Sequence, residues 1–160
     1  MRDAMIEENG ARPAPDGRND GRRGGAAAVV DGKKAVPFAL IIDDQETVCR
    51  VVAMALSNLG VESAAYTTAK PAVASLDQRR PDVIFLDVAL DQSDAIDVIK
   101  GLSEKRYTGT VQLMSGGRLP LLEAMQRIGA RYGLAVRPAL QKPFRGEDLR
   151  RAIVELGLTG

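Results

Sequence analysis

The chain has 160 residues, of which 45% are hydrophobic and 27% charged, which suffices for one well-packed domain and leaves little for a second. Its 22 Lys and Arg residues nearly balance its 21 Asp and Glu residues, so net charge gives no argument for binding to nucleic acid or a membrane. Histidine is absent, which excludes histidine acid/base catalysis, histidine metal ligands and phosphohistidine in this chain.

Residues 1–35 have a different composition from the rest of the chain. They are rich in Gly, Pro and interleaved charges, which predicts a disordered N-terminal tail before a folded domain over residues 36–160. The "GRRGG" run lacks aromatic residues, so a solvated arm is favoured over an RNA contact. The chain has no secretory-type apolar segment, no apolar run near the about 20 residues that cross a bilayer, and one cysteine, Cys49. We therefore expect a cytoplasmic protein.

The first half of the domain alternates apolar runs with helical spacings. "VPFALII" at 36–42 predicts a buried strand, and apolar residues then recur at steps of three and four over 48–59, as in a helix. "VESAAY" at 61–66 predicts a weaker strand. "TTAKPAVASLDQ" at 67–78 offers a Thr N-cap and a proline in the first turn of a second helix. "DVIFLD" at 82–87 predicts another buried strand.

The second half repeats the same alternation. A helical stripe over 96–102 precedes "TVQLM" at 110–114, which predicts a strand. A further stripe over 121–128 precedes the weaker strand candidate "LAVRPALQ" at 134–141, and a last stripe covers 149–156. A strand followed by a helix, five times over, predicts a five-stranded parallel sheet with helices on both faces, which is a doubly wound α/β fold.

Polar residues that carry chemistry stand where these strands end. Asp43 and Asp44 follow the first strand, Asp87 ends the third, Ser115 lies near the end of the fourth, and Lys142 follows the fifth. In an open parallel sheet the carboxyl ends of the strands border the ligand crevice. Each residue alone is explained as a solvated loop acid, a turn serine or a surface lysine. Together they predict one phosphoryl site.

The residue types at the strand ends define a chemistry. Clustered carboxylates repel one another, and a hard divalent cation such as Mg²⁺, which prefers oxygen ligands, relieves that repulsion. A carboxylate can also attack phosphorus and form an aspartyl phosphate. An ammonium and a hydroxyl then offset the charge on the phosphoryl oxygens.

The motifs "IIDD", "VIFLD", "LMSG" and "QKPF" resemble those of the receiver domain of two-component response regulators, in order, spacing and strand context, over residues 37–157. The resemblance implies a flavodoxin-like (βα)5 three-layer sandwich. It also implies that Asp87 is the phosphoacceptor. The other roles carried over are Mg²⁺ ligation by Asp43, Asp44, Asp87 and the backbone carbonyl of Ala89, phosphoryl contact and switching by Ser115 and Lys142, and a cis peptide bond before Pro143.

The chain departs from the receiver pattern at three places. Ala139 stands where receivers commonly place an aromatic switch residue, three positions before the lysine. In the stretch after Asp87, Asp91 replaces a common proline and Ala95 a common glycine. The segment between Ser115 and Lys142 is several residues longer than in most receivers. A hydroxyl-to-aromatic switch is therefore not expected here.

We therefore expect a stand-alone receiver that takes a phosphoryl group from a histidine kinase or histidine phosphotransfer protein and signals by binding an unknown target protein. Its only chemistry would be its own phosphorylation and dephosphorylation, and a homodimer would use the face made by the fourth helix, fifth strand and fifth helix. One alternative is a degenerate receiver used for docking or dimerisation. Another is a phosphatase of the haloacid dehalogenase kind, although Gln45 stands where that family needs its second acid.

Overall fold

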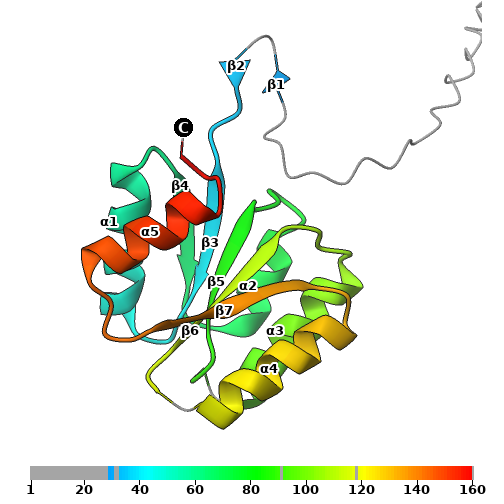
Figure 1. Cartoon of the computed structure of the whole chain (residues 1–160). Helices are drawn as coiled ribbons and strands as arrows, with labels where there is room; N and C mark the ends of the chain where they lie inside the picture. The colour runs from blue at the N-terminus through cyan, green and yellow to red at the C-terminus, as the bar shows by residue number, and fades with distance from the viewer. Residues whose placement is uncertain (1–28, 31–32, 91, 118, 160) are drawn as a thin grey trace, which may run out of the picture.

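The computed structural model describes residues 29–30, 33–90, 92–117 and 119–159. Their main feature is a five-stranded parallel sheet in the order β4-β3-β5-β6-β7, flanked by five helices (Figure 1). The predicted doubly wound α/β fold is confirmed, including both weaker strand candidates. None of the helices described has the length and apolar character that a membrane-spanning helix requires.

The elements alternate along the chain as the sequence predicts. The strands of the main sheet are β3 (Phe38–Ile42), β4 (Glu62–Tyr66), β5 (Val83–Asp87), β6 (Thr110–Ser115) and β7 (Ala135–Gln141). The helices are α1 (Glu46–Asn58), α2 (Ala69–Ser75), α3 (Gln92–Glu104), α4 (Leu119–Arg131) and α5 (Gly146–Glu155).

Two short strands precede the main sheet, inside the segment that the sequence assigns to a tail. β1 (Val29–Val30) pairs antiparallel with β2 (Lys33–Lys34). Residues 1–28 and 31–32 lie outside the described part of the chain. The disordered tail and the domain boundary at residue 36 therefore stay predictions.

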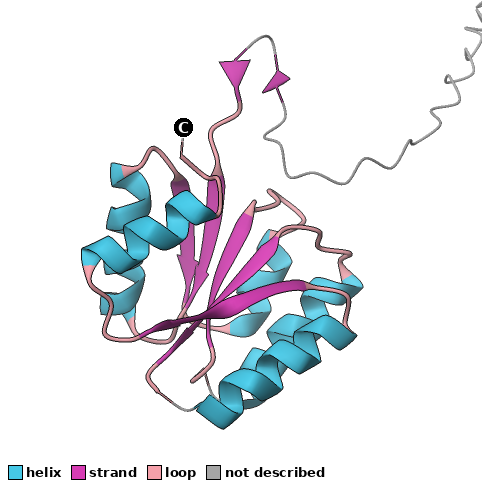
Figure 2. Cartoon of the chain, in the orientation of Figure 1, coloured by secondary structure: helices cyan, strands magenta, loops and turns pink. Residues whose placement is uncertain are grey.

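The helices divide between the two faces of the sheet, which makes three layers (Figure 2). Strand β3 shows why, because successive side chains of a strand point to opposite faces. Leu40 and Ile42 pack with α2, α3 and α4, whereas Ala39 and Ile41 pack with α1 and α5. Every residue of β5 is buried, as expected for a central strand covered on both faces.

The strand order reverses beside β3. The chain passes from β3 to its neighbour β4 on one side, and then crosses back to β5 on the other side. A crevice for a ligand forms at such a reversal, beyond the carboxyl ends of the strands. Asp43 directly follows β3 and Asp87 ends β5, so the fold places both carboxylates at this point.

The turn before β6 leaves no space for a side chain at Gly109. Tyr107 is buried there and its hydroxyl donates to the carbonyl of Thr110, while the backbone of Asp82 accepts from the Thr110 N–H. A Cβ at Gly109 would collide with the Tyr107 hydroxyl and lie 2.7 Å from the carbonyl oxygen of Asp82.

We expect Gly109→Ala to lower the free energy of unfolding by about 2 kcal/mol, because the Asp82 backbone cannot move without disturbing the sheet. Gly146→Ala is the matched control, since a Cβ at Gly146 meets nothing within 4 Å. Urea denaturation of both variants measures the difference. Equal stability of the two variants would mean that the turn relaxes around the new methyl group.

Candidate functional site

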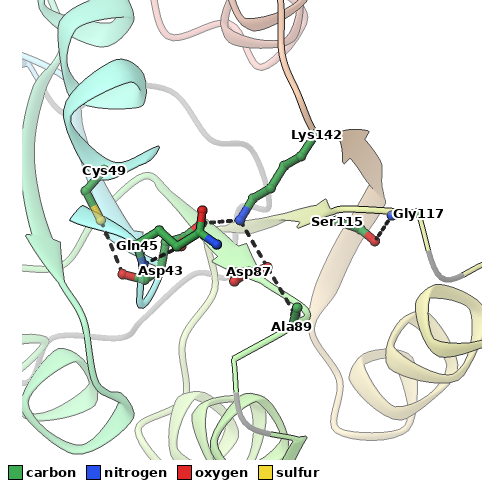
Figure 3. A network of polar contacts seen from close by, with 8 residues as sticks. All are labelled: Asp43, Gln45, Cys49, Asp87, Ala89, Ser115, Gly117 and Lys142. Atoms are coloured by element: carbon green, nitrogen blue, oxygen red, sulfur yellow. Dashed lines mark hydrogen bonds and ion pairs between the residues drawn. The ribbon is translucent and has the colours of Figure 1, made fainter. Parts of the chain in front are cut away.

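Two buried carboxylates, Asp43 and Asp87, meet at the strand reversal (Figure 3), and the exposed carboxylate of Asp44 lies close to them. Asp43 has 0% and Asp87 2% of its surface exposed, whereas Asp44 is exposed. One carboxylate oxygen from each residue lies within 4.8 Å of the others. The apolar strands explain the burial, since each carries its terminal aspartate to the edge of the packed core.

Lys142 brings a positive charge to the two buried carboxylates from the end of β7, 99 residues after Asp43 in the chain. Its Nζ lies 2.5 Å from Asp43 Oδ2, to which it donates a hydrogen bond, and 3.3 Å from Asp87 Oδ1. Its side chain is 15% exposed. The Lys142 N–H donates to the carbonyl of Ser115 at 2.6 Å, and the Lys142–Pro143 peptide bond is cis, the geometry that the resemblance implies.

Backbone amides hold each buried carboxylate in place. Asp43 Oδ1 accepts from the N–H of Gln45 at 2.9 Å, and Asp87 Oδ1 accepts from the N–H of Ala89 at 3.0 Å. Each bond joins a carboxylate to the N–H two residues later, as in an Asx turn, and adds a backbone contact to the one that Lys142 makes. The sequence predicts the aspartates, but it gives no signal for either amide contact, and the expected metal ligation by the Ala89 carbonyl stays a prediction.

The electrostatics of the site leave room for a divalent cation. Burial raises the pKa of Asp43, while the hydrogen bonds from Lys142 and from the Gln45 N–H act against that rise. Three carboxylates and one ammonium carry a formal charge of about minus two, which a divalent ion balances. Oxygen ligands this close together are the donor set that Mg²⁺ prefers, so the residues present fit the ion that the sequence predicts.

Cys49, on α1, lies next to Asp43. Its buried thiol donates to the backbone carbonyl of Asp43 at 3.4 Å. Burial and the charge of Asp43 raise the pKa of the thiol. A thiol held protonated is a poor nucleophile and metal ligand, so Cys49 acts as a small core residue.

Ser115 lies at the end of β6 but stands apart from the carboxylates. It is 4% exposed, and its hydroxyl accepts from the Gly117 N–H at 3.2 Å (Figure 3). Within the described part of the chain, no hydrogen bond joins the hydroxyl to Asp43, Asp87 or Lys142. The structure thus brings three of the predicted side chains into contact and keeps the serine beside them.

A groove that sequence reasoning did not find borders Lys142. It has a volume of about 470 Å³ and runs from the start of α1 to the segment after β7. Val48 and Val51 line it from α1, with Pro143 and Phe144 opposite. These residues are distant in the sequence, and only the packing of α1 against the β7–α5 connection brings them together.

Comparison with known proteins agrees with this geometry. Residues 39–154 match the response regulator receiver domain family. The chain is 27% identical over 122 residues to the photosynthetic apparatus regulatory protein RegA of Rhodovulum sulfidophilum, a match that covers 76% of this chain and 63% of that protein. The chain thus spans less than two thirds of the length of this relative.

Solved structures share the fold. Chemotaxis protein CheY4 of Vibrio cholerae superposes with a TM-score of 0.65 at 22% identity, over 76% of this chain and 99% of that one. A response regulator from Colwellia psychrerythraea gives 0.65 at 21% identity, over 76% of this chain and 97% of that one. The flavodoxin-like, CheY-like architecture is therefore confirmed. Because the family match covers most of the sequence, the chain belongs to the response regulator receiver domain family of two-component signalling.

Proposed function

We propose that this chain is a phosphoacceptor in a two-component system, with Asp87 as the residue that takes the phosphoryl group. The donor is a phosphohistidine on a histidine kinase or a histidine phosphotransfer protein. The observation that supports this most is the contact of the Lys142 ammonium with two buried carboxylates at one strand reversal. The fold does not need this arrangement, since apolar residues at the same positions would stabilise it at least as well as buried charges do.

The proposed transfer follows from the position of Asp87. A carboxylate oxygen of Asp87 attacks phosphorus as the bond from phosphorus to the donor imidazole nitrogen breaks, and the donor ring, which carries a proton on its other nitrogen, leaves as neutral imidazole with the electron pair. The product is an acyl phosphate, and water later attacks phosphorus to release inorganic phosphate and restore the carboxylate. Bound Mg²⁺ would supply charge neutralisation for the phosphoryl oxygens, held by Asp43, Asp44, Asp87 and the Ala89 carbonyl.

Lys142 has a second role in this proposal. Its ammonium rests on Asp43 and Asp87 before transfer, and a new dianionic phosphoryl group on Asp87 offers it a stronger partner. A short movement of the side chain would exchange one contact for the other. Ser115, buried beside the site, would then donate its hydroxyl proton to a phosphoryl oxygen.

The signal would leave through the face made by α4, β7 and α5. Ala139 on β7 is partly buried and carries no ring, so the aromatic rotamer change of many receivers is excluded. Exposed apolar side chains at the start of α4 (Leu119), just after its end (Tyr132) and on α5 (Val154) suit a protein contact. We propose that a target protein, or a second copy of the chain, binds there.

Acetyl phosphate with Mg²⁺, followed by intact-mass measurement, tests the proposal. We expect the mass of the protein to rise by one phosphoryl group and to fall back on standing. No gain with acetyl phosphate or with a phosphorylated donor protein would favour the docking alternative. Repeated turnover of a phosphate ester would favour the phosphatase alternative, although Gln45 stands where that family needs its second acid.

A further inference from the structure

Strand β7 contains one more residue than its neighbour β6 needs. The two strands pair regularly from Thr110↔Ala135 to Gln112↔Arg137, and the pairing resumes at Met114↔Leu140. Two residues of β7, Pro138 and Ala139, therefore stand opposite a single residue of β6, Leu113. This arrangement is a β-bulge. Bulges are rare between parallel strands and often re-aim a side chain close to a functional site.

The bulge changes the face of the sheet on which the side chains at the end of β7 lie. In a regular strand Val136 and Leu140 would lie on the same face, because the side-chain period is two. Instead Val136 packs with the cluster under α2, α3 and α4, while Leu140 packs with the cluster under α1 and α5. Lys142 comes two residues after Leu140 and continues this shifted register, and its N–H donates a hydrogen bond to the carbonyl of Ser115. The bulge therefore determines the position and direction of Lys142 at the end of the strand.

Gln112 donates two side-chain hydrogen bonds at the bulge. It is a polar residue in a central strand and only 3% exposed. Its side-chain NH₂ donates to the carbonyl of Pro138 at 2.6 Å and to the carbonyl of Leu113 at 3.1 Å. Pro138 and Leu113, together with Ala139, are the residues that lack a register partner across this pair of strands. One amide thus joins the two strands where their regular pairing is interrupted, and loss of these hydrogen bonds would destabilise the bulge.

We propose that Gln112 is a positioning residue for Lys142: its amide holds the bulge in β7, and the bulge directs the Lys142 ammonium to Asp43 and Asp87. The consequence for phosphoryl transfer rests on the proposed function. The geometric part does not, because it concerns the resting contact of Lys142.

Gln112→Met tests this, since methionine fills a similar volume and donates no hydrogen bond. The first readout is the ¹³Cε–¹⁵Nζ NMR signal of Lys142 in the metal-free protein, assigned by its loss in Lys142→Met. We expect this signal to move or broaden in Gln112→Met and to stay in place in the control Gln78→Met, an exposed glutamine far from the site. The second readout is the phosphorylation rate with acetyl phosphate, which we expect to fall about tenfold because the lysine is misplaced.

Deleting Pro138 in the Gln112→Met background provides the rescue. This deletion removes the extra residue and leaves Leu140, Gln141 and Lys142 in their present register, so there is no bulge for the amide to hold. We expect the Lys142 signal and the rate to return towards those of the wild-type chain. If Gln112→Met alone does not fold, a folded double variant with a normal Lys142 signal supports the proposal, and failure of both variants to fold overturns it.

A double-mutant cycle separates a positioning effect from a general one. In a Lys142→Met background, Gln112→Met should change the phosphorylation rate no further. An equal tenfold loss in that background, or an unchanged Lys142 signal in Gln112→Met, would overturn the proposal. A chain that is never phosphorylated would defeat the proposed function, while the NMR comparison would still decide the role of Gln112.

Discussion

Asp87→Asn is expected to abolish the gain of a phosphoryl group from acetyl phosphate. An amide oxygen is a far weaker nucleophile than a carboxylate and cannot form a stable acyl phosphate. The fold should persist, because the substitution removes one of two buried like charges and keeps the shape of the side chain. Intact mass with Mg²⁺ and excess donor measures the loss, and circular dichroism verifies the fold.

Asp77→Asn is the matched control for this substitution. Asp77 is an exposed aspartate that pairs with Lys105 at 2.6 Å on the surface, away from the strand reversal. It should gain one phosphoryl group at the wild-type rate. A full gain in Asp87→Asn would show that another group, such as the buried Asp43, is the nucleophile, and the assignment of Asp87 would fall.

The fold could be predicted from the sequence because each strand and helix leaves a local pattern of apolar residues. The run at 82–87 is apolar throughout since β5 is covered on both faces, and the helical stripes mark the faces that pack on the sheet. The weak candidate at 134–141 forms β7 although its composition is mixed, because β7 is an edge strand and is only half buried. Pro138 is tolerated there for the same reason.

The site could be predicted only in part from the sequence. Topology alone predicts that Asp43, Asp87 and Lys142 meet, since each ends a strand of one parallel sheet. The bulge in β7 and the role of Gln112 could not be predicted, because they depend on a register that nonlocal packing selects. The orientation of Ser115 towards Gly117 could not be predicted for a different reason: the contact is local, and a hydroxyl can rotate to any of several nearby partners.

Lys142 shows how the site balances charge before an ion or a phosphoryl group binds. Its ammonium is the counter-charge for Asp43 and Asp87 in the resting structure. The lysine and a divalent ion should therefore substitute for one another in stabilising the fold. This relation gives a test that requires no phosphorylation.

Lys142→Met is expected to lower the free energy of unfolding of the metal-free protein by about 3 kcal/mol, because it leaves two buried carboxylates without their partner. The same variant in saturating Mg²⁺ should recover most of that loss, since the ion then supplies the missing charge and binds the native state alone. Lys105→Met is the control: its surface pair with Asp77 should contribute about 1 kcal/mol or less, with or without Mg²⁺. Urea denaturation of both variants at several Mg²⁺ concentrations measures the difference. A loss for Lys142→Met that stays the same at every Mg²⁺ concentration would mean that the carboxylates do not form the ion site, because only an ion bound there can replace the ammonium.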